Sequence, residues 1–499
     1  MSNLFETFKL VDRAERVALV LQNGTRVTYG DLATLAGQIA HFLDDIGVAP
    51  GDRIVVQVYK SHMALALFLA CLQRGAVFVP LNTAYTLQEV SYFIDDAQPK
   101  LVVCDPESFC HMMSAVPSAD STVVTLGSDG DGTLRQRLST PAFDIELRYP
   151  DDLAAILYTS GTTGRPKGAM LSHANLCSNA RVLTDLWRFT QEDVLLHALP
   201  IFHAHGLFVA CNVLLLAGGR MIFLPKFDIE EMLESLPKAT SMMGIPTFYT
   251  RLLADERLTP DRVRHVRLFT SGSAPLLAET HAAWQQRTGH AILERYGMTE
   301  TGMITSNPYN SERIAGTVGI ALPGTEVRVV DQETGTELPR GKIGMIEVKG
   351  DNVFKGYWRL PEKTSTEFRP DGFFITGDLG TVDDRGYVRV VGRDKDLIIS
   401  GGLNVYPKEV ETEIDSIDGV IESAVFGVPH PDFGEAVTAV VVTEKDFSMT
   451  QTDMLRMLAG RLAKFKLPKQ IFVVAELPRN AMGKVQKAEL RHMYQPHDW

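Results

Sequence analysis

The chain has 499 residues, of which 45% are hydrophobic and 22% are charged, a composition typical of a globular protein that buries a large core without disulfides or metals. At about 150 residues per domain, this length predicts two to four domains. The formal net charge of −12 disfavours binding to nucleic acid and to anionic lipid, so anionic ligands would need local positive charge.

Residues 54–104 alternate strand-like and helix-like segments. Strands are predicted at residues 54–58, 76–80 and 101–104, and a helix is predicted at residues 61–73. Thr86 and Glu89 have the spacing of a capping box, which predicts a helix that ends at about Ala97. This alternation is typical of parallel sheets with helices on both faces, so the expected fold class is α/β.

The character of the sequence changes after about Gly316. Glycine, proline and short β-branched runs dominate residues 331–391, which predicts antiparallel strands and turns. The charged residues 393–396 are expected to form an exposed connector. Helices are then predicted at residues 408–416 and 453–464, and a strand at residues 437–442, giving an α+β unit of about a hundred residues. We therefore expect one domain over residues 1–393 and a second over residues 394–499.

The five cysteines are odd in number and form no CxxC pair. Buried, reduced thiols in a reducing compartment are the expected state. The N-terminus carries acidic residues and lacks the apolar core of a signal peptide. The longest apolar run, residues 63–72, is far shorter than the roughly 20 residues that a membrane span needs. We expect a soluble, cytoplasmic protein of uncertain oligomeric state, monomer or dimer, and an organelle address elsewhere in the chain stays open.

The most informative string is YTSGTTGRPKG, residues 158–168, which follows the apolar, strand-like LAAIL. Its glycines permit tight turns, its hydroxyls can donate to phosphate oxygens and its lysine supplies positive charge. Backbone amides in such a loop bind polyphosphate, and Ser172 is expected to cap the helix that follows.

This loop is not a Walker A motif, which requires GxxxxGK followed by Ser or Thr. Lys167 instead follows Pro166 and precedes Gly168, so a P-loop kinase is disfavoured. A glycine-rich surface loop is the plain alternative, but an eleven-residue string is far more specific than a single glycine pattern.

Five further strings follow in order: SGSAPL at 271–276, ERYGMTET at 294–301, TGD at 376–378, GRDKDLIISGG at 392–402 and PRNAMGKVQK at 478–487. Together with the loop, they resemble the adenylate-forming superfamily of acyl-CoA synthetases, aryl-CoA ligases, luciferases and peptide-synthetase adenylation domains. The resemblance implies a large N-terminal domain of stacked α/β sheets with a β-rich subdomain, and a small, mobile α+β C-terminal domain. It also implies an AMP-forming acid–thiol ligase that uses ATP, Mg²⁺ and CoA.

The resemblance implies a set of ATP- or AMP-binding residues: Thr159, Ser160, Gly161, Thr162, Thr163, Gly164, Lys167, Ser273, Ala274, Pro275, Glu294, Arg295, Tyr296, Gly297, Met298, Thr299, Asp378 and Arg393. Thr299 is expected to contact the α-phosphate. Asp378 can accept from both ribose hydroxyls, and Arg393 can add a second ribose contact. An Asx turn is the plain alternative for Asp378. Glu300 is expected to bind the magnesium ion that neutralises the charge of ATP, and a helix-start carboxylate is its alternative.

Lys484 matches the family's catalytic lysine, which would stabilise negative charge during adenylation. The plain alternative is a solvated surface lysine. Lys395 matches the hinge about which the small domain would rotate between the two half-reactions. Gly401 and Gly402 would then meet the CoA thiol. Three lysines near the end could contact CoA phosphates or form a solvated basic face, namely Lys464, Lys466 and Lys469.

LPIFHAHG, residues 199–206, resembles the family's gating segment. His203 would be the acyl-site histidine that moves between half-reactions. His203 and His205 could also be interpreted as metal ligands, but an HxH pair alone is weak evidence.

The acid itself is set by the pocket lining. In MMGIPTFYTRLL, residues 242–253, Arg251 could pair with a second carboxylate, with hydrogen bonds from Ser273 and His205, or could lie on a solvated helix face. The strings HALPIFHAHGLF, GIPTFYTRLL, ERYGMTETGMITSNPY and FITGDLG together resemble malonyl-CoA synthetases, which activate malonate and often methylmalonate, and this resemblance covers nearly the full length. It implies that Arg251 binds the distal carboxylate and that Met303 limits the pocket. Ala204 departs from the family's hydroxyl or branched residue, so the pocket is predicted to admit substituted malonates.

Other interpretations stay open. A synthetase for acetate or a medium-chain acid would leave Arg251 unpaired. An adenylation enzyme could serve a free-standing carrier protein, since the 15 residues after Lys484 are too few for a fused carrier domain of about 80 residues. A non-catalytic nucleotide-binding protein would tolerate loss of Lys484, Glu300 and Asp378, so their presence disfavours it. A luciferase-like oxygenase also begins by adenylation.

Overall fold

The computed structural model describes residues 3–116, 121–139, 144–159, 165–401, 403–431, 433–445, 447–480 and 483–495. The chain divides into two compact units. The first contains Met1–Glu326 and Lys349–Gly372, and the second contains Val327–Val348 and Phe373–Trp499. The boundary predicted between residues 393 and 394 stays a prediction.

In the described part of the first unit, six strands form one sheet in the order β6-β5-β3-β4-β7-β8. They are β3 (Arg53–Gln57), β4 (Val77–Pro80), β5 (Leu101–Cys104), β6 (Thr122–Thr125), β7 (Leu153–Thr159) and β8 (Lys167–Ser172). All neighbours are parallel except β7 and β8. The predicted strands at 54–58, 76–80 and 101–104 are confirmed.

A second sheet has the order β15-β14-β13-β12-β11-β9-β10-β1-β2. Its strands are β1 (Val17–Leu21), β2 (Arg26–Thr28), β9 (Val194–His197), β10 (Arg220–Phe223), β11 (Ser241–Gly244), β12 (Leu268–Ser271), β13 (Leu293–Met298), β14 (Gly302–Ser306) and β15 (Ile320–Ala321). The run from β13 to β1 is parallel, whereas β2, β14 and β15 pair antiparallel at the edges. The carboxyl ends of the parallel strands meet at one edge of the sheet, which is where such sheets place ligands.

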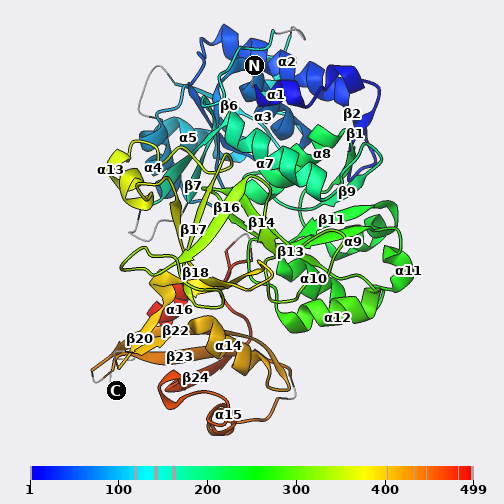
Figure 1. Cartoon of the computed structure of the whole chain (residues 1–499). Helices are drawn as coiled ribbons and strands as arrows, with labels where there is room; N and C mark the ends of the chain where they lie inside the picture. The colour runs from blue at the N-terminus through cyan, green and yellow to red at the C-terminus, as the bar shows by residue number, and fades with distance from the viewer. Residues whose placement is uncertain are drawn as a thin grey trace. The chain divides into compact units, whose positions relative to one another are not determined.

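Helices accompany both sheets (Figure 1). They are α1 (Leu4–Thr7), α2 (Tyr29–Asp45), α3 (His62–Arg74), α4 (Leu87–Ala97), α5 (Phe109–Ala115), α6 (Thr133–Gln136), α7 (His173–Leu186), the π-helix η3 (His205–Cys211), α8 (Asn212–Ala217), α9 (Ile229–Ser235), α10 (Pro246–Leu253), α11 (Pro260–Val263), α12 (Ala278–Thr288) and α13 (Pro361–Glu367). Local signals fix several starts. Ser61 caps α3, Thr86 and Glu89 form the predicted capping box of α4, and Ser172 caps α7.

The β-rich subdomain predicted from residues 331–391 is confirmed as the sheet β16-β17-β18-β19. Its strands are β16 (Thr325–Val330), β17 (Gly344–Gly350), β18 (Phe374–Val382) and β19 (Val388–Arg393). The pairs β17/β18 and β18/β19 are antiparallel. Residues 394–396 follow as the short 3-10 helix η5 (Asp394–Asp396).

The remainder of the second unit is a sheet with the order β21-β20-β23-β22, in which β24 also pairs with β23. Its elements are β20 (Ile398–Ser400), β21 (Leu403–Val405), α14 (Pro407–Asp415), β22 (Val420–His430), β23 (Gly434–Thr443), α15 (Gln451–Leu458), η6 (Lys464–Lys466), β24 (Gln470–Val474) and α16 (Lys487–Met493). Successive side chains of β23 point to opposite faces of the sheet. Val441 packs in a hydrophobic core with residues of α14 and α15, and Val440 packs in a second core with α16.

One helix boundary was predicted wrongly. The helix expected at residues 453–464 is α15, which ends at Leu458. Its buried residues are Met454 and Leu458, Ala459 is its C-cap, and Gly460 comes next, where glycine disfavours helix continuation.

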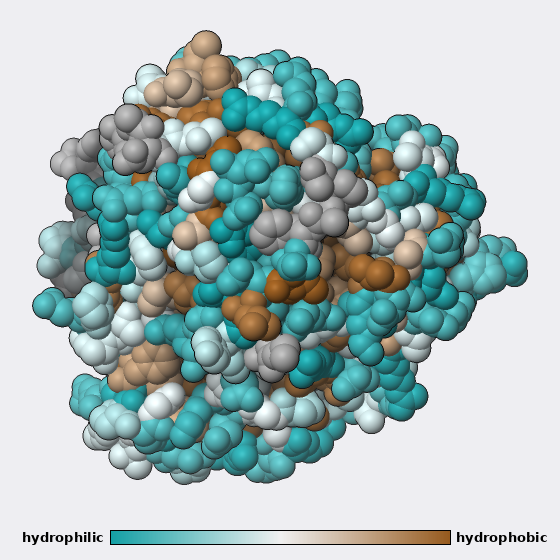
Figure 2. Space-filling view, turned by 90° about the horizontal axis from the view of Figure 1, so that it is seen from above, coloured by the Kyte–Doolittle hydropathy of each residue, from teal (hydrophilic) through white to brown (hydrophobic). Residues whose placement is uncertain are grey.

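None of the helices in the described part of the chain has the length and apolarity needed to cross a bilayer. The face in Figure 2 is mainly hydrophilic, and its hydrophobic residues lie in small separate groups.

Candidate active site

The predicted site residues of the first unit follow the carboxyl ends of parallel strands. His203 and His205 follow β9, Arg251 follows β11, Ser273, Ala274 and Pro275 follow β12, Glu294–Met298 form most of β13, Thr299 and Glu300 lie in the turn after β13, and Met303 is in β14. Because these ends share one sheet edge, residues up to 100 positions apart are brought to one side of the sheet.

Glu300 lies in the tight turn between β13 and β14 and is 5% exposed. Its Oε1 accepts a hydrogen bond from the Tyr357 hydroxyl at 3.1 Å and a longer one from Thr159 Oγ1 at 3.4 Å. Thr159 ends β7 at the entrance to the phosphate loop. The structure therefore brings the predicted metal ligand to the base of the predicted phosphate loop.

The phosphate-loop residues Ser160, Gly161, Thr162, Thr163 and Gly164 lie outside the described residues. Lys167 begins β8 and is 9% exposed. Its Nζ lies 3.7 Å from the Glu367 carboxylate and 4.2 Å from the ring centroid of Tyr357. Tyr357 thus contacts both Lys167 and Glu300. Sequence reasoning missed this tyrosine, because no motif marks it.

A second group lies beyond β12. Ser273 has φ +70°, a left-handed conformation that costs a non-glycine residue about 1–3 kcal/mol. Its Oγ is 3.1 Å from Nδ1 of His205. A Cβ at the neighbouring Gly272 would lie 2.3 Å from Nη1 of Arg295, so only glycine leaves room for that guanidinium.

Arg295 is 4% exposed, and its Nε and Nη2 have no hydrogen-bond partner among the described residues. Burial lowers the pKa of Arg295 to about 9, so the guanidinium keeps its charge at neutral pH. His205 is 1% exposed, and burial together with the charge of Arg295 holds its pKa well below the usual range. His205 is therefore neutral. We call Arg295, His205 and Ser273 the acid-site cluster.

Arg295 is predicted from the sequence to bind the nucleotide, and this role stays a prediction. Its guanidinium lies close enough to His205 to lower the pKa of that ring, and it lies against Gly272, the residue before Ser273. Arg251, predicted to hold the distal carboxylate, is exposed on α10 with its guanidinium 5.6 Å from the ring centroid of Phe227. The role of Arg251 stays a prediction.

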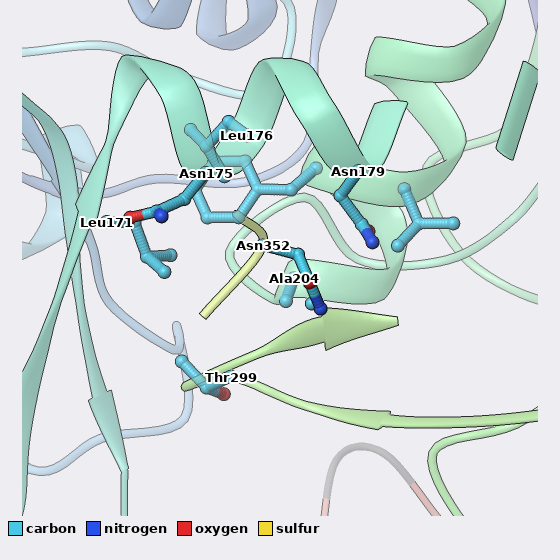
Figure 3. A pocket seen from close by; sticks show the side chains of 10 residues that line it. Leu171, Asn175, Leu176, Asn179, Ala204, Thr299 and Asn352 are labelled. Atoms are coloured by element: carbon cyan, nitrogen blue, oxygen red, sulfur yellow. The ribbon is translucent and has the colours of Figure 1, made fainter. Parts of the chain in front are cut away.

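Figure 3 shows a pocket that is lined by Ala204, the residue before His205. Ala204 and Thr299 line it together with three asparagines, Asn175, Asn179 and Asn352. The asparagines were not anticipated from the sequence, because an asparagine carries no distinctive motif. Ala204 lines this pocket, and the tolerance of substituted malonates stays a prediction.

Two of these asparagines hold the backbone beside the pocket. Asn179 of α7 accepts from the Met303 N–H at 3.1 Å and donates to the Met303 carbonyl at 2.9 Å. Asn352 donates to the carbonyls of Thr301 and Met303 at 2.8 and 3.1 Å. They fix the strand that carries Met303, which is 3% exposed.

In the second unit, Asp378 of β18 pairs with Arg393 at the end of β19. Arg393 Nε lies 3.0 Å from Asp378 Oδ1, and Asp378 is 4% exposed. The Asp378 N–H donates to Thr376 Oγ1 at 3.0 Å. The structure therefore brings the two predicted ribose ligands together, and the carboxylate is used in an ion pair within the sheet.

Lys484 belongs to the same neighbourhood. Desolvation, together with the charges of Arg393 and Lys395, lowers the pKa of Lys484 to about 8, and Asp378 opposes this. The Lys484 N–H donates to Asn480 Oδ1 at 3.0 Å. The charges of the predicted hinge residue and of the two predicted ribose ligands thus all act on the predicted catalytic lysine.

The predicted CoA residues are less defined. Gly401 has φ +59°, and its N–H donates to the Phe433 carbonyl at 2.8 Å, whereas Gly402 lies outside the described residues. Among the three lysines near the end, Lys466 pairs with Glu409 at 2.5 Å and Lys469 lies 4.9 Å from the Phe433 ring centroid. These contacts agree with the plain alternative of a basic surface held by local partners.

Residues 9–358 match the AMP-binding enzyme family, and residues 409–484 match the AMP-binding enzyme C-terminal domain. The chain belongs to the AMP-binding enzymes. It is similar to the ATP-bound MatB structure from Rhodopseudomonas palustris, with 58% identity, a TM-score of 0.97 and 99% of each chain covered. It is 34% identical to a malonate–CoA ligase of Arabidopsis thaliana, over 98% of this chain and 89% of the relative. It is also 36% identical to a feruloyl-CoA synthase of an Amycolatopsis species, over 95% of each.

These similarities confirm three expectations from the sequence. The resemblance to adenylate-forming enzymes, and within them to malonyl-CoA synthetases, holds over the full chain. The α/β fold with a small C-terminal domain is confirmed. The enzyme class is AMP-forming acid–thiol ligase.

Proposed function

We propose that the protein is a malonyl-CoA synthetase. Malonate attacks the α-phosphorus of ATP, which gives malonyl-AMP and pyrophosphate, and the CoA thiol then displaces AMP to give malonyl-CoA. Similarity to MatB and to the malonate–CoA ligases supports the assignment.

The observation that carries this proposal is the buried Arg295 guanidinium, two of whose nitrogens have no hydrogen-bond partner among the described residues. An uncompensated buried charge is costly. A monocarboxylic acid would use its only carboxylate at the α-phosphorus and leave Arg295 uncompensated. A dicarboxylic acid brings a second carboxylate, which a guanidinium binds with two parallel hydrogen bonds. Neutral His205 and Ser273 add hydrogen-bonding groups beside it.

Magnesium is the expected cofactor, and the residues fit it. No group of three or more His, Cys, Asp or Glu side chains in the described residues could hold a metal by itself. Mg²⁺ bound to ATP needs only one or two protein carboxylates besides the phosphates, and the buried Glu300 would supply one. The ion would neutralise phosphate charge and favour release of pyrophosphate.

We also propose that the reaction takes place in the cytoplasm with only small-molecule partners, namely ATP, malonate and CoA. All five cysteines are free thiols, four of them buried, as expected in a reducing compartment.

The test is pyrophosphate release with ATP, Mg²⁺ and CoA against malonate, methylmalonate, succinate, acetate, octanoate, benzoate and ferulate. Arg295→Met removes the charge at similar volume, and Arg251→Met is the matched change on the exposed arginine. We expect malonate to give the highest kcat/KM, and Arg295→Met to lower it for dicarboxylates by about 30-fold or more, as removal of a buried charge partner does.

The outcomes separate the alternatives. If Arg251→Met shows the larger dicarboxylate-specific loss, the distal carboxylate is bound at α10 and Arg295 has another role. If acetate, octanoate or ferulate has the highest kcat/KM, the malonate proposal is wrong, although the ligase class stands.

A further inference from the structure

A buried chain of hydrogen bonds links three segments of the first unit that are distant in sequence. Lys60, which follows β3, places its Nζ 2.7 Å from Nδ1 of His197 and 2.9 Å from the His197 carbonyl oxygen. His197, the last residue of β9, places its Nε2 2.8 Å from the carbonyl oxygen of Gly206 in η3. Lys60 is 9% exposed and His197 is fully buried.

The partners assign the tautomer of His197. A lysine ammonium only donates, and a carbonyl oxygen only accepts. Nδ1 facing Lys60 must therefore present its lone pair. Nε2, which faces the Gly206 carbonyl at 2.8 Å and also lies 3.4 Å from Cys211 Sγ, must carry the proton, because the carbonyl is the closer partner and only accepts. The held-down pKa of His197, which burial and the neighbouring Lys60 charge both cause, agrees with a neutral ring. Lys60 thus fixes which nitrogen can donate to Gly206.

Burying the Lys60 ammonium beside His197 costs desolvation free energy. Its Nζ forms no ion pair with a described carboxylate, and besides His197 it lies 4.2 Å from the ring centroid of Phe223. Burial lowers the pKa of Lys60 to about 7. A methionine would fill the same space without desolvating a charge, so stability alone does not account for a lysine here.

The end of this chain lies next to the acid-site cluster. Gly206 directly follows His205, whose Nδ1 meets Ser273. The His205 N–H in turn donates to Nδ1 of His203 at 3.2 Å. A Cβ at Gly206 would lie 2.0 Å from the carbonyl oxygen of Pro200, so this backbone is closely confined. π-Helical turns such as η3 occur frequently at functional sites.

We propose that Lys60 and His197 are positioning residues for the acid: the Lys60–His197–Gly206 chain holds the start of η3, and with it His205, in the geometry that receives the substrate carboxylate. Neither side chain touches the substrate. This inference rests on the proposed function only in taking the cluster around His205 as the acid site.

The first test is Lys60→Met, with Lys238→Met as the matched change at an exposed lysine. Without the ammonium, the His197 proton can move to Nδ1, and Nε2 then faces the Gly206 carbonyl with a lone pair. Loss of this hydrogen bond is expected to raise the KM for the acid by about tenfold or more. The KM for ATP is expected to change little. The melting temperature is expected to fall modestly, because the buried His197 carbonyl loses a donor, and Lys238→Met is expected to change none of these values.

A second pair of variants tests the hydrogen bond that Nε2 of His197 donates to the Gly206 carbonyl. His197→Gln keeps an amide N–H near the position of Nε2, whereas His197→Asn is too short to reach Gly206. We expect the glutamine variant to retain most of the affinity for the acid and the asparagine variant to lose it. Adding Lys60→Met to His197→Gln should change the KM for the acid less than threefold, because an amide has no tautomer to lose.

Three results would overturn the inference: an unchanged KM for the acid in Lys60→Met, equal rises in the KM values for ATP and acid with a lowered melting temperature, or full additivity of Lys60→Met and His197→Gln. These results are independent of which acid is preferred, since the variants are compared on the best acid of the wild-type panel. A wild-type preference for a monocarboxylic acid would refute the malonate proposal alone.

Discussion

At the scale of single residues, the presence or absence of a carboxylate partner separates a structural arginine from a functional one. Arg267 is held by Asp193, with Nε 2.8 Å from Oδ1, and this pair also orders Thr240 between two strands. The Asp193 carboxylate compensates the charge of Arg267, so the pair needs no ligand to account for it. Arg295 has no described carboxylate to pair with, and this difference separates it from a structural arginine. An uncompensated buried cation is therefore the most informative residue-scale feature of the first unit.

The pH dependence of adenylation tests the local field around Lys484. Its pKa is lowered to about 8, and only the protonated form can stabilise the negative charge of the reaction. The kcat/KM for pyrophosphate release, which reports groups of the free enzyme, is expected to fall as pH rises through about 8. Lys484→Ala is expected to lower this value about 10²–10³-fold at pH 7.

Arginine at the same position gives the decisive comparison. Because an arginine stays protonated at high pH, Lys484→Arg should shift the falling limb to higher pH even if its maximal rate is lower. A falling limb that stays near pH 8 in this variant would show that another group titrates.

At the scale of elements, the active-site strand β14 is held from α7 rather than by its sheet neighbours alone. The Asn179 side chain makes the two hydrogen bonds that a neighbouring strand would make, since it accepts from the N–H of Met303 and donates to the carbonyl of Met303. A Cβ at Gly302 would lie 2.8 Å from Asn179 Oδ1, so the glycine permits this close approach. The helix thereby sets the position of the residue predicted to limit the acid pocket.

Asn179→Leu is expected to destabilise the protein by about 1–3 kcal/mol, because it removes partners from buried backbone groups. We also expect a weakened preference for malonate over methylmalonate, since β14 is less firmly held. Urea unfolding and the two kcat/KM values measure these effects, with Asn310→Leu as a control at an exposed asparagine. Unchanged selectivity despite lower stability would mean that Asn179 serves folding alone.

The same elements show what the sequence could predict. The capping box of Thr86 and Glu89 depends on residues three apart, so it was predicted and is confirmed. The environment of Arg295 depends on Gly272 and His205, which sheet pairing brings from distant positions, so a local string could not predict the burial of this guanidinium. Tyr357 and the asparagines of the pocket were missed for the same reason.

At the scale of the whole molecule, the same chain carries out both half-reactions. The resemblance predicts that the small domain rotates about Lys395 between them. Proline fixes φ near −65° and removes the N–H. Lys395 lies in the first turn of η5, where a missing N–H costs little. Lys395→Pro is therefore expected to keep the described local conformation while it prevents the change of φ that a hinge needs.

The prediction is a separation of the two steps. In single-turnover experiments, Lys395→Pro should form malonyl-AMP within a few-fold of the wild-type rate, whereas transfer to CoA should slow by about 100-fold or more, as expected when a hinge is locked. Lys395→Ala, which leaves φ free, should slow neither step to this extent. Equal slowing of both steps by proline would place the hinge elsewhere or make Lys395 part of the adenylation site, where its lowered pKa and its proximity to Arg393 and Asp396 would then need a catalytic explanation.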